Sequence, residues 1–171
     1  MSSQGGFMVY YTDGSAHPNP GPGGFGVVLV SDNETYESYN KETQRTTNNA
    51  EEMKAILWAM ADAIRKGETA EIFSDSSYAI NTFTKWYPSW KRNGWVKGDG
   101  KVPENLELVK AYDELSQYIT PVFHHIRGHA GIKYNEMADK LATGKMTGTL
   151  NLAYALMEET HGLPKVERVD F

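Results

Sequence analysis

The sequence predicts a single α/β domain built on a mixed β-sheet, and three observations support this prediction. First, 171 residues are enough for one domain with a sizeable core and too few for two ordinary domains. Second, segments rich in β-branched and aromatic residues alternate with segments whose apolar residues recur at helical spacing. Third, the predicted order is βββαβααβα, in which the second and third strands form a hairpin and the first strand connects to the fourth through a helix. A right-handed crossover makes the first and fourth strands parallel neighbours, and the hairpin occupies the other side.

The N-terminal half is predicted to contain three strands, a helix and a fourth strand. The strands are rich in β-branched and aromatic residues, the second and third flank a polar turn, and the helix has apolar residues at helical spacing before a glycine stop. A segment dense in Pro and Gly is predicted as a turn. In order, these elements are strand 7–12, turn 17–24, strand 24–30, turn 31–34, strand 35–40, helix 53–67 and strand 70–74.

The C-terminal half is predicted to contain two helices, a fifth strand and a last core helix. A basic stretch that carries tryptophans separates the first two helices, and a glycine-bounded loop precedes the last one. In order, these elements are helices 76–86 and 104–118, strand 121–127, loop 128–131 and a helix whose buried face is marked by Tyr134, Ala138, Leu141 and Ala142. A further amphipathic helix is expected, with apolar residues spaced from Leu150 to Met157 and an end at Gly162. It would cover a sheet edge or a flank of the core, and partner binding is its alternative role.

The charge, the cysteine content and the apolar segments of the sequence limit the kinds of ligand and partner that this protein can have. The net charge of −5 argues weakly against bulk attraction to nucleic acid, but residues 85–101 carry five cations and one anion. Because the chain has no cysteine, a metal ion would have to bind oxygen or imidazole ligands. No window approaches the ~18 apolar residues of a membrane span, and the N-terminus lacks the features of a signal peptide. We therefore expect a soluble, cytoplasmic protein with no membrane partner.

Two aspartates end strands that are predicted to be neighbours. Asp13 ends the first strand before Gly14, and Asp75 ends the fourth before Ser76. Neighbouring strands lie about 4.8 Å apart, and ligands bind beyond their carboxyl ends at a topological switch point, so the two carboxylates are expected to meet. They would repel each other unless a divalent cation such as Mg²⁺ lay between them. The alternative is that each aspartate serves only the turn that follows its strand.

Two further acids border the apolar faces of helices. With Asn48 as the N-cap of its helix, Glu51 could complete a capping box, which would leave Glu52 free. Asp139 similarly borders the apolar face of the last core helix. The alternatives are that Glu52 only interacts favourably with the helix dipole and that Asp139 is simply solvated.

Five sequence blocks, taken together, resemble type 1 ribonuclease H. They are Tyr11-Thr12-Asp13-Gly14-Ser15, Asn19-Pro20-Gly21-Pro22-Gly23-Gly24, Thr46-Thr47-Asn48-Asn49-x-x-Glu52, Ser74-Asp75-Ser76-x-Tyr78, and Gly128-His129-Ala130-Gly131 with Asn135-x-x-x-Asp139. Their order and separations are similar to those of the family over residues 7–142. The resemblance implies a ribonuclease H-like fold, a mixed five-stranded sheet in order 3-2-1-4-5 with helices on both faces. Residues 1–143 would form this catalytic domain, and residues 144–171 a helical C-terminal extension packed on it.

The resemblance also implies a reaction, endonucleolytic cleavage of the RNA strand of RNA–DNA hybrids that leaves 5′-phosphate and 3′-hydroxyl ends. Two Mg²⁺ ions about 4 Å apart would bracket the scissile phosphate, and Mn²⁺ would substitute. His129 would be a mobile histidine able to exchange protons near neutral pH. The implied catalytic residues are Asp13, Glu52, Asp75, His129 and Asp139, of which the four carboxylates would bind the metal.

Contacts to the hybrid are implied as well. Short amides would contact its sugar and base edges, because an amide can both donate to and accept from a 2′-hydroxyl. Arg45, Thr47 and Asn105 would surround a DNA phosphate. The implied substrate-binding residues are Asn19, Arg45, Thr47, Asn48, Asn49, Ser76, Trp86 and Asn105.

Several of these side chains have structural alternatives. Asn19 could support the Pro/Gly turn and Asn48 could cap a helix, roles that are compatible with recognition. Trp86 and Trp90 are four residues apart and could belong to the core. His124 and His125, adjacent on a strand, are predicted to point to opposite faces and to be structural.

Three rival functions fit parts of the pattern. They are a non-catalytic hybrid- or duplex-RNA-binding module, a strand-transfer or junction-resolving nuclease, and a reverse transcriptase domain. A non-catalytic module would be expected to lack one carboxylate, and all four are present. The Asn-rich helix start and the Trp-bearing protrusion favour the hybrid-specific family. The start at Met1 favours a stand-alone enzyme over a domain of a reverse transcriptase. We expect no separate hybrid-binding domain before Phe7. The enzyme is expected to act as a monomer without an obligate protein partner.

Overall fold

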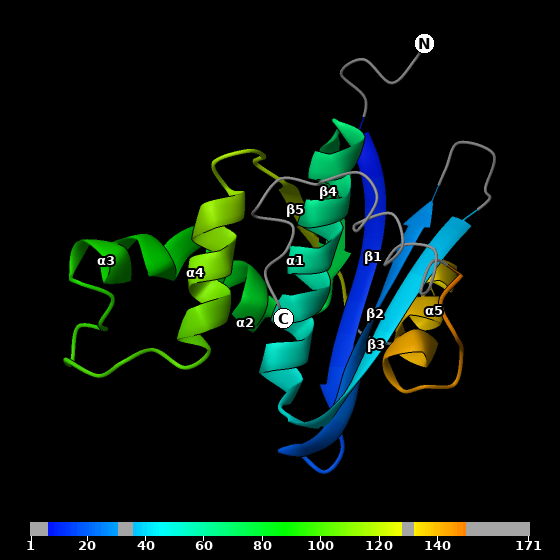
Figure 1. The fold of residues 1–171 in the computed structure, drawn as a ribbon, viewed down its shortest axis with the longest axis horizontal. Helices are drawn as coiled ribbons and strands as arrows, with labels where there is room; N and C mark the ends of the chain where they lie inside the picture. The colour runs from blue at the N-terminus through cyan, green and yellow to red at the C-terminus, as the bar shows by residue number, and fades with distance from the viewer. Residues whose placement is uncertain (1–6, 31–35, 128–131, 150–171) are drawn as a thin grey trace.

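The computed structural model describes residues 7–30, 36–127 and 132–149, and its centre is a five-stranded sheet (Figure 1). The strands are β1 (Phe7–Ala16), β2 (Gly21–Val30), β3 (Tyr36–Thr46), β4 (Thr69–Ser74) and β5 (Val122–His125). They lie in the order β3-β2-β1-β4-β5. The first three strands are antiparallel, and β4 and β5 run parallel to β1. The predicted mixed sheet and its strand order are therefore confirmed.

Two helices cover opposite faces of this sheet. Helix α1 (Asn48–Lys66) packs on β1, β2 and β4, whereas α5 (Lys133–Ala142) packs on β2, β1 and β3 from the other side (Figure 1). Each helix buries an apolar face, as its spacing predicts. The larger core, with α1, includes Tyr10, Phe25, Met53, Ile56, Leu57, Met60 and Ile72, and the smaller core, with α5, contains Val28, Ala138 and Leu141.

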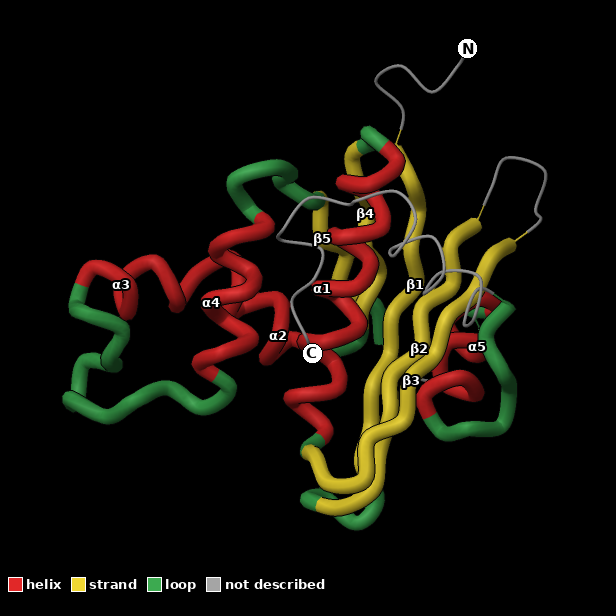
Figure 2. The backbone as a smooth tube through the Cα atoms, viewed as in Figure 1, coloured by secondary structure: helices red, strands yellow, loops and turns green. Residues whose placement is uncertain are grey.

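The remaining helical segments lie to one side of α1 (Figure 2). They are α2 (Ser77–Asn81), the π-helical turn η1 (Thr82–Trp86), α3 (Tyr87–Arg92) and α4 (Leu106–Leu115). Helix α4 packs against α1, and its buried residues join the larger core. Within the described residues, no helix combines the length and the apolar character that crossing a membrane requires.

The N-terminal strands are longer than the sequence patterns predict. Strand β1 continues past Asp13 to Ala16, because residues 14–16 pair with β2. Likewise β2 begins at Gly21, inside the segment predicted as a turn, and β3 extends to Thr46. The glycines serve close packing: a Cβ at position 26 would lie 2.4 Å from the Cβ of Leu141 in α5. A glycine-rich strand thus lets a helix approach the sheet closely.

Three helix boundaries also differ from the prediction. The N-cap of α1 is Thr47 rather than Asn48, and its Oγ1 accepts a hydrogen bond from the Ala50 N–H at 3.1 Å. The helical path predicted to end at residue 86 continues to Arg92, because Pro88 falls in the first turn of α3, where a missing N–H costs little. Helix α4 begins only after Asn105, whose φ of 58° is left-handed.

Residues after α5 contact the edge strand β3. The Gly148 N–H donates to Asn40 Oδ1 at 2.6 Å, and the Thr149 N–H donates to Ser38 Oγ at 3.1 Å. The Ser38 N–H donates in turn to Thr149 Oγ1 at 3.0 Å. These contacts give β3, which is the last strand on its side of the sheet, a partner on its outer edge. The predicted turn 31–34, loop 128–131 and helix from Leu150 to Met157 lie outside the described residues.

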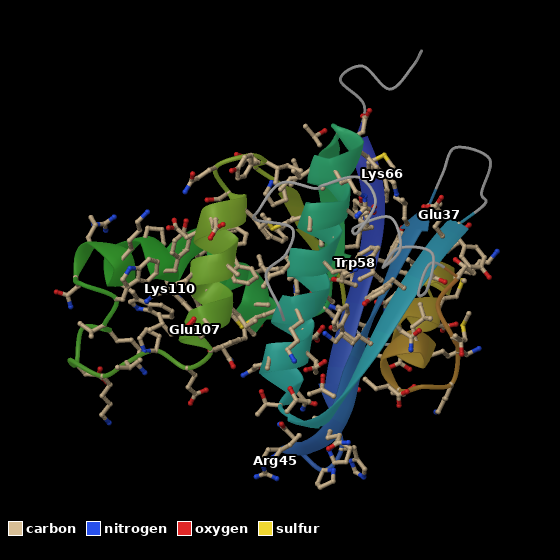
Figure 3. All side chains as sticks on the ribbon, viewed as in Figure 1. Glu37, Arg45, Trp58, Lys66, Glu107 and Lys110 are labelled. Carbon is tan, nitrogen blue, oxygen red and sulfur yellow. The ribbon has the colours of Figure 1, made fainter. Side chains whose placement is uncertain are left out.

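A buried carboxylate ties the end of α1 to the sheet. Asp62 is fully buried and accepts hydrogen bonds from the Tyr10 hydroxyl at 2.7 Å, from Arg65, and from Lys66 Nζ at 2.9 Å. Lys66 also pairs with Glu37 on β3 at 3.2 Å. Figure 3 labels both residues, near the end of α1 and the start of β3. Burial and the Asp62 carboxylate raise the pKa of Tyr10 well above its ordinary value. This network joins β1, α1 and β3.

We predict that Asp62→Asn lowers the free energy of unfolding by about 3 kcal/mol, because it removes the buried charge that pairs with Arg65 and Lys66. Tyr10→Phe is the control, and it should cost only about 1 kcal/mol because it removes one hydrogen bond. Urea unfolding at constant pH measures both. Equal, small losses for the two variants would contradict a special role for the buried charge.

Candidate active site

The sheet register brings the two strand-ending aspartates together. Tyr11 of β1 pairs with Phe73 of the parallel strand β4, and Asp13 and Asp75 each follow two residues later. Because side chains alternate along a strand, both carboxylates lie on the same side as these paired rings, which stack with centroids 4.8 Å apart. The predicted meeting of the two aspartates is confirmed, although Asp13 lies within β1, three residues before its end, and only Asp75 follows the end of its strand.

Glu52 reaches the same place from the first turns of α1. The start of this helix touches the end of β1 through main-chain atoms: a Cβ at Gly14 would lie 2.3 Å from the carbonyl carbon of Glu51 and 2.4 Å from the nitrogen of Glu52. Only glycine fits there without moving the helix. Carboxylate oxygens of Asp13, Glu52 and Asp75 consequently lie within 4.8 Å of one another.

These carboxylates line an open pocket of about 290 Å³. Asp139 enters it from α5, within hydrogen-bonding reach of Asp13. The pocket lining contains five acids and no cation; it comprises Asp13, Gly14, Ser15, Asn48, Glu52, Asp75, Asn135, Glu136 and Asp139. The four carboxylates that the resemblance implies therefore share one site.

The electrostatics of the pocket oppose full ionisation. Burial, followed by the charge of Asp75, raises the pKa of Asp13 from 3.8 to about 8, although a hydrogen bond from the Gly14 N–H acts in the other direction. Burial, and then the charges of Asp13 and Asp75, raise the pKa of Glu52 well above its ordinary value. The pocket therefore favours protonation of its acids or the binding of a cation.

Unpaired oxygens in the lining fit a divalent cation. Within the described part of the chain, Glu52 Oε1 and Asn135 Oδ1 are buried and have no hydrogen-bond partner. Such orphaned acceptors are costly unless a cation or its bound water satisfies them. Carboxylate and amide oxygens are also the ligands that Mg²⁺ prefers. The structure thus contains an acidic cluster able to hold metal ions.

Two of the predicted substrate-binding asparagines link the β1–β2 turn to α1. Asn48 Oδ1 accepts a hydrogen bond from the Ala16 N–H at 2.7 Å, and the Asn48 N–H donates to Asn19 Oδ1 at 3.0 Å. Both asparagines are exposed, so their amides have surface left for a ligand. Asn49 lies beside them in the first turn of α1 and is half-buried. Asn19 and Asn48 thus hold the Pro/Gly turn against α1, which agrees with the structural role predicted for Asn19. Asn48 does not cap the helix, because the N-cap is Thr47.

Four other predicted substrate contacts are not among the residues that line the pocket. Arg45 is exposed near the end of β3 (Figure 3), and Thr47 uses its hydroxyl to cap α1. Asn105 is the residue directly before α4. Ser76 is buried, and its Oγ accepts a hydrogen bond from the Ala79 N–H at 3.0 Å as the N-cap of α2. Their roles toward a substrate stay predictions.

The two candidate tryptophans differ in exposure. Trp86 is 41% exposed and meets Tyr78 edge to face, with ring centroids 6.1 Å apart. Trp90 is half-buried and packs against the larger core. Exposure therefore leaves Trp86 available for contact and makes Trp90 mainly a core residue.

The histidines on β5 do not enter the pocket lining. His124 stacks on Phe73 with centroids 4.5 Å apart, and its Nε2 lies 2.8 Å from Glu71 Oε1. His125 Nε2 lies 3.2 Å from the main-chain oxygen of Asp75. His129, the predicted mobile histidine, lies outside the described residues.

Four residues that line the pocket had no role predicted from the sequence: Gly14, Ser15, Asn135 and Glu136. Asn135 was part of a recognised block, and it lies four residues before Asp139, which places both on one face of α5. That spacing was a usable signal. Gly14 was visible only as a turn residue, because its contact with α1 depends on the fold.

Comparisons with known proteins agree with this geometry. An RNase H family model matches residues 6–147. The chain is 41% identical over 132 residues to a ribonuclease H of Rhizobium meliloti (strain 1021), a match that covers 77% of this chain and 85% of the relative. It is similar to RNase H1 from the halophilic archaeon Halobacterium salinarum NRC-1, with a TM-score of 0.61 and 27% identity over 80% of this chain and 95% of that chain. LC11-RNase H1, solved in complex with an RNA/DNA hybrid, gives a TM-score of 0.57 and 25% identity over 87% of this chain and 99% of that chain.

A family match over most of the chain, close relatives of similar length and a shared sheet order all point the same way. The chain belongs to the ribonuclease H family, whose known activity is endonucleolytic cleavage of RNA in RNA–DNA hybrids.

Proposed function

We propose that this ribonuclease H cleaves the RNA strand of RNA–DNA hybrids by metal-dependent hydrolysis and leaves 5′-phosphate and 3′-hydroxyl ends. The observation that carries the proposal is the convergence of Asp13, Glu52 and Asp75 within 4.8 Å, in a pocket that Asp139 also lines. The hybrid bound to the similar LC11-RNase H1 supports this class of substrate. The chain would act as a monomer, with residues 1–143 as its catalytic domain and residues 144–171 packed on that domain.

The four carboxylates would hold two divalent ions, with Mg²⁺ as the resident metal and Mn²⁺ as a substitute. When bound, such ions activate a water molecule and stabilise the leaving oxygen of a phosphodiester. The protein holds the carboxylates in place: strands β1 and β4 fix Asp13 and Asp75, and helices α1 and α5 bring Glu52 and Asp139 to them. Their burial strengthens the attraction between carboxylate and cation.

The other site residues would bind the hybrid and move protons. Asn48 is exposed and lines the carboxylate pocket, and the exposed Asn19 is hydrogen-bonded to it, so both amides could contact a 2′-hydroxyl. Arg45 would bind a DNA phosphate, and the exposed ring of Trp86 would contact the DNA strand. His129 would exchange a proton near the scissile bond, which fits the reference pKa of histidine.

Cleavage of four matched duplexes tests the proposed substrate and reaction. The duplexes are RNA–DNA, DNA–DNA, RNA–RNA, and DNA with one embedded ribonucleotide, each incubated with and without Mg²⁺. We expect cleavage of the RNA strand of the hybrid only when Mg²⁺ is present. Rapid cleavage of RNA–RNA or DNA–DNA, or cleavage of the hybrid in a chelator, would contradict the proposal.

Asp13→Asn is the matched control for that assay. Its neutral amide cannot bridge two cations, although its volume is almost unchanged, so hydrolysis should be lost while circular dichroism stays that of the wild type. Turnover above a few per cent of wild type in Mg²⁺ would count against the metal assignment.

The stability of the metal-free protein should fall as pH rises from about 4 to 8. The pKa of Asp13 is raised to about 8 in the folded protein, so the folded state holds a proton that the unfolded chain releases near pH 4. The stabilisation from this proton is complete below the unfolded pKa and is lost as pH rises through the folded one. Bound Mg²⁺ replaces the proton, so it should raise the melting temperature more at pH 8 than at pH 6.

Thermal unfolding in a chelator and in Mg²⁺, from pH 5 to 8.5, measures this effect. Asp13→Asn isolates it from other titrating groups, because the variant should show a shallower pH dependence and a smaller gain from Mg²⁺. Parallel curves for wild type and variant would contradict the assignment of the titration to this site.

Arg45→Ala should weaken hybrid binding and make it less sensitive to salt. Each phosphate neutralised by a cation contributes about −0.9 to the slope of log affinity against log salt on B-form DNA, so the hybrid slope should become shallower by somewhat less than one unit. Affinity is measured across a salt series in Ca²⁺, which is expected to support binding without hydrolysis. The control is Lys145→Ala, which removes an exposed cation after α5. Coincident lines for wild type and Arg45→Ala would refute the phosphate contact.

A further inference from the structure

Glu51 is a buried carboxylate immediately before the site residue Glu52, and it is absent from the pocket lining. The capping box predicted for it does not form, because the N-cap is Thr47 and Glu51 is the fourth residue of the helix. Instead, its Oε2 accepts a hydrogen bond from Thr46 Oγ1 at 2.6 Å and lies 2.9 Å from Lys54 Nζ. These contacts join the first turns of α1 to the last residue of β3.

Stability alone does not account for a charge at this position. The side chain is 0% exposed, and its Oε1 has no hydrogen-bond partner among the described residues. Replacing a buried ion pair by apolar residues of similar volume is often neutral or stabilising. Apolar residues in place of both Glu51 and Lys54 would therefore stabilise the helix start about as well, and the value of the charged pair lies in the geometry that the two contacts of Glu51 impose.

The contacts of Glu51 affect the position of Glu52 through the main chain. Thr46 pairs with Gly21 of β2, so the bond to Thr46 anchors α1 to the sheet. The carbonyl of Glu51 and the nitrogen of Glu52 are the atoms that contact the Gly14 position, directly after Asp13. A shift of the helix start by a few tenths of an ångström would therefore change the separation between the carboxylates of Glu52 and Asp13.

We propose that Glu51 is a positioning residue: its contacts with Thr46 and Lys54 hold the start of α1 so that Glu52 meets Asp13 and Asp75 at the spacing that divalent cations need. The inference rests on the proposed function, because it concerns the same metal site. Glu51 itself touches neither substrate nor metal. It acts through the backbone of its neighbour.

The test compares Glu51→Met, Glu51→Gln and wild type by calorimetric titration with Mg²⁺ and by the Mg²⁺ dependence of hybrid cleavage. Methionine keeps the volume but removes both contacts, so it should weaken Mg²⁺ binding by about tenfold, at the low end of the effect of residues that support metal ligands. Cleavage should then require correspondingly more Mg²⁺. Glutamine can still accept from Thr46, and it should restore binding to within about threefold of wild type.

Asp62→Asn is the matched control. Asp62 is also a fully buried carboxylate of α1 paired with a cation three residues later, but it lies eleven residues from Glu51, roughly 16 Å along the helix. This variant should melt at a lower temperature and bind Mg²⁺ as wild type does. The inference is overturned if Glu51→Met binds Mg²⁺ like wild type, or if Asp62→Asn weakens Mg²⁺ binding equally. Failure of the proposed function is distinguishable, because wild type itself would then neither bind Mg²⁺ nor cleave the hybrid, which would overturn both.

Discussion

The main-chain contact between the end of β1 and the start of α1 is the constraint on which the site depends. At Gly14 the two backbones are so close that a single added carbon would overlap the carbonyl carbon of Glu51. The contact brings Asp13 and Glu52 together from elements that are 39 residues apart in the chain. The parallel register of β1 and β4 then adds Asp75, and the packing of α5 on the glycine-rich strand β2 adds Asp139.

Such a cluster is unfavourable for the metal-free fold. Burial and mutual repulsion disfavour its ionised form, and buried oxygens are left without partners. Folding has to offset this cost elsewhere, in the apolar core beneath α1 and in the Asp62 network at the far end of the same helix. The helix thus has a stabilising end and a functional end. In its proposed role, Glu51 keeps the functional end in register with the sheet.

The sequence predicted the elements and their order because their patterns are local, and the crossover rule placed β1 beside β4. It also grouped the four carboxylates correctly, through strand ends and through motif resemblance. It missed what depends on tertiary contact. The strand residues after Asp13 looked like a turn because glycines are typical of turns, and Glu51 looked like a cap because its true partner, Thr46, is set by where β3 ends. Asn135 has the spacing from Asp139 that places both on one face of a helix, but the sequence does not reveal that its side chain is buried.

In the proposed function, these four carboxylates form one site for two divalent ions. The most direct measurement is the anomalous scattering of Mn²⁺ in a crystal of the wild-type protein with a non-cleavable RNA–DNA hybrid. We predict two peaks about 4 Å apart, both among the carboxylates of Asp13, Glu52, Asp75 and Asp139 and next to a phosphate of the RNA strand. A hybrid bound in the pocket with no peak among these carboxylates, or with metal only at another surface, would contradict the claim.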